Sequence, residues 1–248
     1  MVIGGLEAPR RRRFSGRGAR PAQSGAVPVE VTRATVVGAE RLDGEARAAA
    51  WLERAGGSES GERVAAALAV LNQALHARRI AAADPYAGEV AARDALVTRV
   101  GYGTGEQVAD GRWTAARELA PERRRTARES ALRPQERFAA LLAARDVALA
   151  CELLALRSRL DLEQGRDREA ALQLDAALRA ALCELEGWRE LSGMPERLEE
   201  LGALASAVSD AAAVARAGAL DQAGREIVDS ALGRLEAALR ARTAGAAF

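Results

Sequence analysis

The strongest constraint on the fold is an apolar stripe with helical spacing in the second half of the chain. Phe138, Leu142, Leu149, Leu153, Leu156 and Leu160 are separated by four, seven, four, three and four residues. This spacing places all six on one face of an α-helix. It predicts one long helix over residues 134–163, beginning at Pro134.

Similar patterns predict helices elsewhere. A return helix over 168–186 after Gly165 implies an antiparallel helical hairpin, and two further amphipathic helices follow over 195–216 and 221–242. Further helices are expected over 45–55, 61–83, 85–100, 113–119 and 121–132, of which 61–83 is a long one. We therefore expect an all-α protein, a multi-helix bundle or an irregular array of helical hairpins.

The turn of the expected hairpin also carries small residues at regular spacing. Gly165 is followed by Ala170 and Ala177, a pattern similar to the turn and second helix of a tetratricopeptide repeat. The similarity covers barely half of one repeat, and Ser158 and Asp161 stand where the preceding helix of that family has its characteristic residues. We interpret the segment as general helical-hairpin chemistry.

The N-terminal residues have a different composition. Residues 1–26 are rich in Gly, Arg, Pro and Ser, and six Arg against one acid give them a net charge of +5, which leaves −4 on the rest of the chain. We expect 1–26 to be a disordered basic tail and 27–248 a single all-helical domain, with 27–112 and 113–248 as its possible sub-units. Alternating Val and β-branched residues over 27–37 allow one short strand or an extended arm.

Composition excludes several kinds of chemistry. All 36 basic residues are Arg, so no phosphate-loop Lys, Schiff-base Lys or Ser-Lys dyad exists, and a single His, His76, rules out a metal site with two or three His. No G-x-S-x-G elbow is present. We expect no cofactor, no metal and no catalytic residue, and we favour a non-enzymatic protein.

Two segments are candidate binding sites. Gly101, Gly103 and Gly105 resemble a phosphate-binding glycine loop, although Glu106 occupies the third position of the pattern and would repel an anion. Thr104 and Gln107 instead suit a capping box, so a structural loop is the simpler interpretation. The second candidate is the basic tail, whose arginines suit nucleic-acid phosphates or a protein partner: Arg10, Arg11, Arg12, Arg13, Arg17 and Arg20.

The apolar runs are interrupted by charges before they could span a membrane, and nothing resembles an export signal. We expect a cytoplasmic protein without membrane contact. Exclusive use of Arg, with abundant Ala and Gly, is typical of a GC-rich bacterial genome.

The sequence favours a scaffold, adaptor or regulatory protein that acts through protein–protein interfaces and self-associates as a homo-oligomer. One alternative is nucleic-acid association through the tail. Another is an enzyme with helix-borne carboxylates near the Gly101–Gly111 loop. An apolar pocket with unpaired carboxylates beside that loop would favour this alternative, and a fully packed bundle would exclude it.

Overall fold

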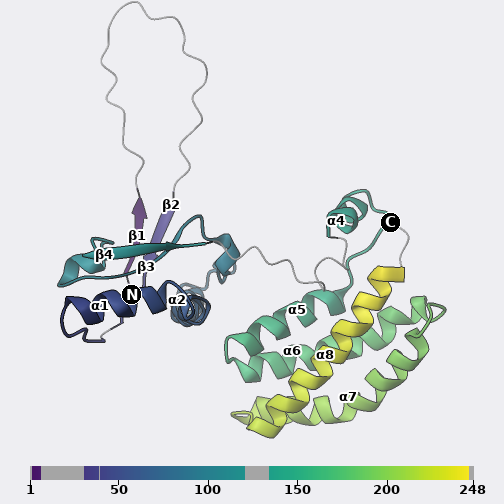
Figure 1. Cartoon of the computed structure of the whole chain (residues 1–248). Helices are drawn as coiled ribbons and strands as arrows, with labels where there is room; N and C mark the ends of the chain where they lie inside the picture. The colour runs from purple at the N-terminus through teal and green to yellow at the C-terminus, as the bar shows by residue number, and fades with distance from the viewer. Residues whose placement is uncertain (1, 7–30, 39, 121–133, 246–248) are drawn as a thin grey trace, which may run out of the picture. The chain divides into compact units, whose positions relative to one another are not determined.

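The computed structural model describes residues 2–6, 31–38, 40–120 and 134–245. These residues are mostly helical, which confirms the expected fold class (Figure 1). The chain forms two compact units, Met1–Arg123 and Arg124–Phe248. The predicted sub-unit boundary after residue 112 falls instead between two strands that pair with each other.

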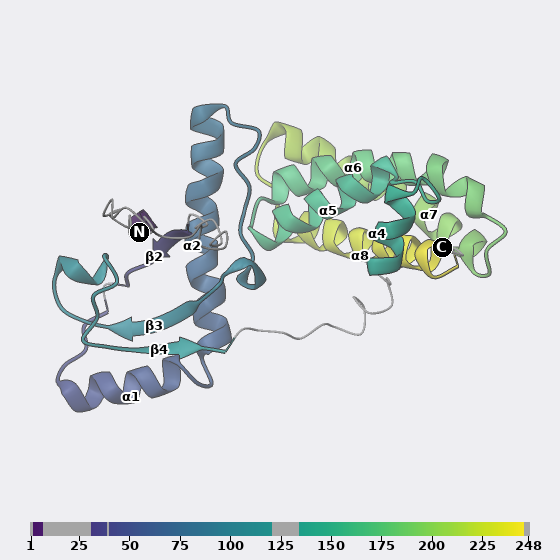
Figure 2. The same ribbon diagram turned by 90° about the horizontal axis from the view of Figure 1, so that it is seen from above.

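The N-terminal unit combines two helices with two antiparallel strand pairs. Strand β1 (Val2–Leu6) pairs with β2 (Val31–Thr35), and β3 (Thr98–Tyr102) pairs with β4 (Ala115–Leu119). Helix α1 (Glu45–Ala55) contacts β3, and α2 (Ser60–Ala82) runs across the β3–β4 pair (Figure 2). Short 3₁₀ turns, η1 (Ala92–Asp94) and η2 (Glu106–Val108), lie before β3 and between β3 and β4.

Few side chains are fully buried in this unit. Among its described residues, the buried apolar side chains are those of Ala48 and Ala55. Asn72 is also buried, and its amide group donates to the Val90 carbonyl at 3.1 Å and accepts from the Val90 amide at 2.9 Å. The Arg63 guanidinium lies 4.9 Å from the ring centre of Trp51 and links α2 to α1.

Three expectations for the N-terminal unit were wrong. Irregular chain, η1 and β3 replace the helix expected over 85–100, and β4 replaces the helix expected over 113–119. Val2–Leu6, which belongs to the expected tail, is a strand. The helices over 45–55 and 61–83 and the strand within 27–37 are confirmed.

The C-terminal unit is a bundle of four helices with a fifth, short helix before it. Helix α6 (Asp167–Glu184) contacts α5 (Ala150–Glu163), α7 (Met194–Ala217) and α8 (Gln222–Gly245), and α8 also contacts α5 and α7 (Figure 1). The 3₁₀ turn η3 (Leu185–Trp188) follows α6, and α4 (Pro134–Leu142) precedes α5. The core of the bundle is apolar, with Leu174, Leu178, Leu201, Leu232 and Leu235 almost completely buried.

The single helix expected over 134–163 is divided in two. Helix α4 ends at Leu142, and the chain turns at Ala144, which has a left-handed φ of 53°. The amide of Arg145 donates to the Ala140 carbonyl at 2.8 Å and closes this helix end. The remaining predicted helices correspond to α6, α7 and α8, whereas the helix expected over 121–132 lies outside the described residues.

No helix in the described part of the chain combines the length and the apolar character that crossing a membrane would require.

Candidate functional site

Helices α4 and α5 and the turn between them carry large apolar side chains in solvent. We call these five residues the α4–α5 surface; each is more than half exposed: Phe138 (60%), Leu142 (74%), Val147 (54%), Leu153 (53%) and Leu156 (69%). All of them except Val147 belong to the apolar stripe over residues 138–160, whose spacing predicts one continuous helix. That stripe does not face the core of the bundle along its whole length.

Helix α5 turns small residues toward the bundle instead. Its buried side includes Cys151, Ala155 and Ser158, and the Ser158 hydroxyl donates to the Ala170 carbonyl of α6 at 2.9 Å. Small side chains on both helices allow this close approach, because bulky leucines between them would hold the backbones apart. Leu153 and Leu156 are three residues apart and therefore share the outer face of α5.

Helix α4 is attached to α5 by charged groups. The Arg137 guanidinium donates to Asp146 Oδ2 at 3.1 Å and to Glu152 Oε1 at 2.5 Å. Asp146 belongs to the turn that follows α4, and Glu152 to the first turn of α5. The only residue of α4 that is fully buried is Ala140. These hydrogen-bonded ion pairs therefore join α4 to the turn that follows it and to the start of α5.

Arg242, near the end of α8, completes this charged cluster from the inside of the bundle. Its side chain is 1% exposed and donates to Asp146 Oδ1 at 2.6 Å and to the Val147 carbonyl at 3.2 Å. Its guanidinium also lies 4.4 Å from the ring centre of Trp188 in η3. A buried cation therefore ties the α4–α5 turn to two distant parts of the bundle.

The electrostatics of Asp146 agree with this arrangement. Burial by itself favours the neutral acid, but hydrogen bonds from Arg137, the Val147 amide and Arg242 stabilise the carboxylate and lower the pKa of Asp146 below its ordinary value. Burial likewise favours the neutral form of the Arg137 guanidinium, yet the two carboxylates raise its pKa. The shifts of both groups therefore favour the charged forms of Asp146 and Arg137 in the folded protein.

Glu184, at the end of α6, binds the beginning of α5. Its two carboxylate oxygens accept from the amides of Ala150 at 3.1 Å and Cys151 at 3.0 Å. These bonds lower the pKa of Glu184 against the opposing effect of burial, whereas burial and the nearby carboxylate raise the pKa of the Cys151 thiol. Cys151 is buried and Cys183 is exposed, and both are free thiols.

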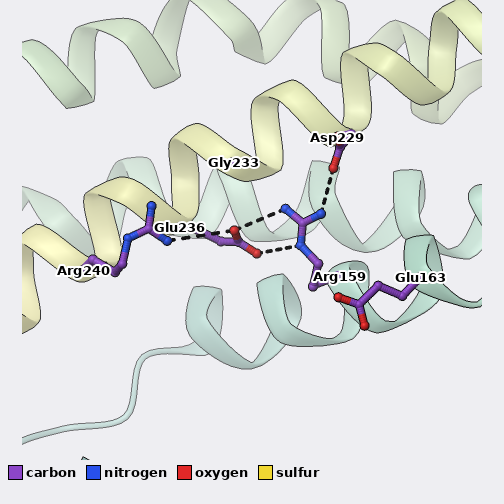
Figure 3. Close-up of a pocket in the computed structure, with 6 residues that line it drawn as sticks. All are labelled: Arg159, Glu163, Asp229, Gly233, Glu236 and Arg240. Carbon is purple, nitrogen blue, oxygen red and sulfur yellow. Dashed lines mark hydrogen bonds and ion pairs between the residues drawn. The ribbon is translucent and has the colours of Figure 1, made fainter. Parts of the chain in front are cut away.

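A polar hollow of about 430 Å³ lies between α5 and α8 (Figure 3). Arg159 crosses it and donates to Glu236 Oε1 at 2.8 Å and to Asp229 Oδ1 at 2.7 Å. These hydrogen bonds outweigh the effect of burial and raise the pKa of Arg159. Because the guanidinium is already held by two carboxylates, we interpret this hollow as a brace between the two helices rather than as a ligand site.

The predicted glycine site has a packing role in the structure. Gly101 belongs to β3, and a Cβ there would lie 2.5 Å from Trp113 Cε3; a Cβ on Gly103 would lie 2.9 Å from Val108. Gly105 has a φ of 74° and precedes η2. Two of the glycines therefore leave room for neighbouring side chains, and the third permits the turn.

The residues that line the hollow beside this loop are Gln107, Arg112, Trp113 and Thr114. None of these four carries a carboxylate, so this hollow does not provide the pocket with unpaired carboxylates that would favour an enzyme. Among the described residues, no group of three or more His, Cys, Asp or Glu is placed to hold a metal ion.

The six arginines of the predicted basic tail, Arg10 to Arg20, lie outside the described residues. The strands on either side of them are described, and Leu6 of β1 pairs with Val31 of β2. Leu6 and Val31, the described residues on either side of the arginines, are therefore paired with each other.

Comparison with protein-family models, with curated proteins and with solved structures found no significant match to this chain.

Proposed function

We propose that this protein is a non-enzymatic scaffold or adaptor that binds other proteins through the α4–α5 surface. The observation that carries the proposal is the exposure of five large apolar side chains over residues 138–156. Large apolar side chains exposed on neighbouring elements often mark interaction sites on soluble proteins. The charged cluster around Arg242 supports the proposal, because its ion pairs join α4 and the turn after it to α5 and α8.

The N-terminal unit supports the same kind of function. Its 23-residue helix α2 has Asn72 as its one fully buried residue, and Ile80 at its end is 70% exposed. Beyond α2, Tyr86 is 94% and Leu96 is 81% exposed. A unit with so little buried apolar surface gains little stability from its own core, so further contacts would stabilise it.

The test is capture of partners from the native cell with the full-length protein. The wild type is compared with the double variant Leu153→Arg/Leu156→Arg and with Val214→Arg, a control at a position on α7 that is 51% exposed. We expect partners to be retained by the wild type and the control and lost by the double variant. Equal recovery with all three proteins would contradict the proposal.

Nucleic-acid association through the six arginines is a separate hypothesis with its own test. Because β1 pairs with β2, deletion of residues 1–26 would also remove a strand, so replacement of the six Arg by Ser is the cleaner change. Binding that falls steeply with salt and disappears in the Ser variant would support this hypothesis. Nuclease treatment during the capture experiment separates it from the proposal above.

A further inference from the structure

We propose that the occupant of the α4–α5 surface is a second copy of this chain, bound about a two-fold axis so that the surface of one copy covers that of the other. This inference rests on the proposed function and makes it specific. Three features of the surface favour a second copy: its area, its mixture of charges, and the outward direction of the leucines on α5.

The exposed area is of the size that a weak or moderate dimer requires. Each of the five side chains leaves on the order of 100 Å² in solvent, so the surface offers roughly 500 Å² of apolar side chain per copy. Two such surfaces, together with the polar groups at their edges, approach the roughly 1,200 Å² at the lower limit of stable interfaces. The surface is therefore large enough for a copy of itself.

The charged residues near the surface are of both signs. Glu136, Arg145, Arg157 and Glu163 are exposed on or between α4 and α5, and they provide two negative and two positive charges. In a two-fold interface each copy presents the same charges, so a single sign would cause repulsion. A balanced edge permits self-association, whereas an edge of one sign would select an oppositely charged partner.

The geometry of α5 is suited to a two-fold contact. Leu153 and Leu156 project from the outer face of a helix whose inner face is closely packed on α6. When two identical helices cross at a two-fold axis, the same side chains of both copies meet. The apolar residues of α4, which the Arg137 ion pairs hold beside the start of α5, would extend this contact.

The first experiment is native mass spectrometry of the full chain over a range of concentrations. We expect a dimer for the wild type and for Val214→Arg, and at least tenfold weaker association for Leu153→Arg/Leu156→Arg, because buried arginines at an interface centre lack partners. Circular dichroism verifies that the variant remains folded. A wild type that is monomeric at every concentration, or a double variant that dimerises as well as the wild type, would overturn the inference.

A cross-linking experiment locates the contact without disrupting it. The exposed Cys183 is first replaced by Ser, while the buried Cys151 remains. Leu156→Cys is then expected to form covalent dimers with a short bis-maleimide reagent, and Val214→Cys, the matched control, is not. Equal cross-linking of both, or of neither, would contradict a second copy at this surface.

These results also separate the inference from the proposed function. A monomeric wild type that still loses captured partners in the double variant refutes the second copy and leaves the scaffold function intact. Dimers that depend on Leu153 and Leu156, with no other partner captured, support the inference and limit the function to self-association.

Discussion

Replacement of Arg242 by Ala should strongly destabilise the C-terminal unit. The Arg242 side chain is 1% exposed, and those of its partners Asp146 and Glu152 are 7% and 14% exposed. Without Arg242, both carboxylates keep Arg137 as their cationic partner. Breaking a buried ion pair costs about 3–5 kcal/mol. Because Arg137 still binds both carboxylates, we expect a loss of about 3 kcal/mol, toward the lower end of that range.

This loss can be measured by urea unfolding followed by circular dichroism and by tryptophan fluorescence. A loss of about 3 kcal/mol in a unit of this size corresponds to a decrease in melting temperature of roughly 10 °C. Trp188 gives a local signal, because its ring loses the guanidinium that lies 4.4 Å away. Trp51 and Trp113 belong to the N-terminal unit and serve as an internal reference.

Arg240→Ala is the matched control on the same helix. Its side chain is 31% exposed and its nitrogen lies 4.0 Å from Glu236, so we expect a loss of under about 1 kcal/mol. Arg242→Lys keeps the charge but not the planar fork that binds several oxygens, and should fall between the wild type and Ala. If Arg242→Ala lost less than about 1 kcal/mol, or no more than Arg240→Ala, the structural role of the cluster would be refuted.

Three further predictions concern separate features of the chain. Thiol titration of the native protein should show fast reaction of Cys183 only, with Cys151 reacting on unfolding; fast reaction of both would contradict the burial of Cys151. The difference in unfolding free energy between the wild type and Asp146→Asn should be largest near neutral pH and shrink as the pH falls below about 4. Folding lowers the pKa of Asp146, so this side chain stabilises the folded protein only while it is ionised. A difference that does not change with pH in urea titrations would refute this prediction. Gly101→Ala should destabilise the N-terminal unit by about 1–3 kcal/mol in thermal unfolding, because the new methyl group would lie 2.5 Å from Trp113 Cε3. Gly88→Ala is the control, because Gly88 has open space around it, and this variant should have little effect.

The helices after Gly165 were predictable because sequence signals and packing agree there. Gly165 has a φ of 70° and ends the first arm of the hairpin, and Pro195 lies in the first turn of α7. Leucines such as Leu174 and Leu178 on α6 are buried, as their spacing predicted. Local propensity and tertiary contacts favour the same structure along this part of the chain.

The division between α4 and α5 could not be predicted because nothing local ends the helix. No Gly or Pro occurs between Leu142 and Ala150. The left-handed residue is Ala144, and the turn is stabilised by Asp146, whose partners include Arg242, distant in sequence. Contacts over a long sequence separation therefore determine the turn, and periodicity does not contain that information.

The candidate surface was missed for a related reason. The leucine stripe is more hydrophobic than the row of Cys151, Ala155 and Ser158, so periodicity shows an apolar face of the helix but not which face packs on the bundle. The structure buries the small residues of α5 because α6 presents Ala170 and other small residues to it. The number of small residues on both arms of the hairpin was the available signal.

The strands of the N-terminal unit left a weaker signal in the sequence. Thr98, Val100 and Tyr102 alternate, and the glycines that follow are typical of a turn. The expected glycine loop thus has a structural explanation, because Gly101 makes room for Trp113 across the strand pair.

Hydrogen exchange in α4 of the full-length protein reports whether the α4–α5 surface is covered by another copy of the chain. This helix has nine residues and one buried side chain, so its amides should exchange rapidly when the α4–α5 surface is uncovered. We predict that exchange over residues 134–142 slows as protein concentration rises in the wild type, and stays fast in Leu153→Arg/Leu156→Arg. Exchange in α4 that is equally fast in both proteins at every concentration would contradict an interface at this surface.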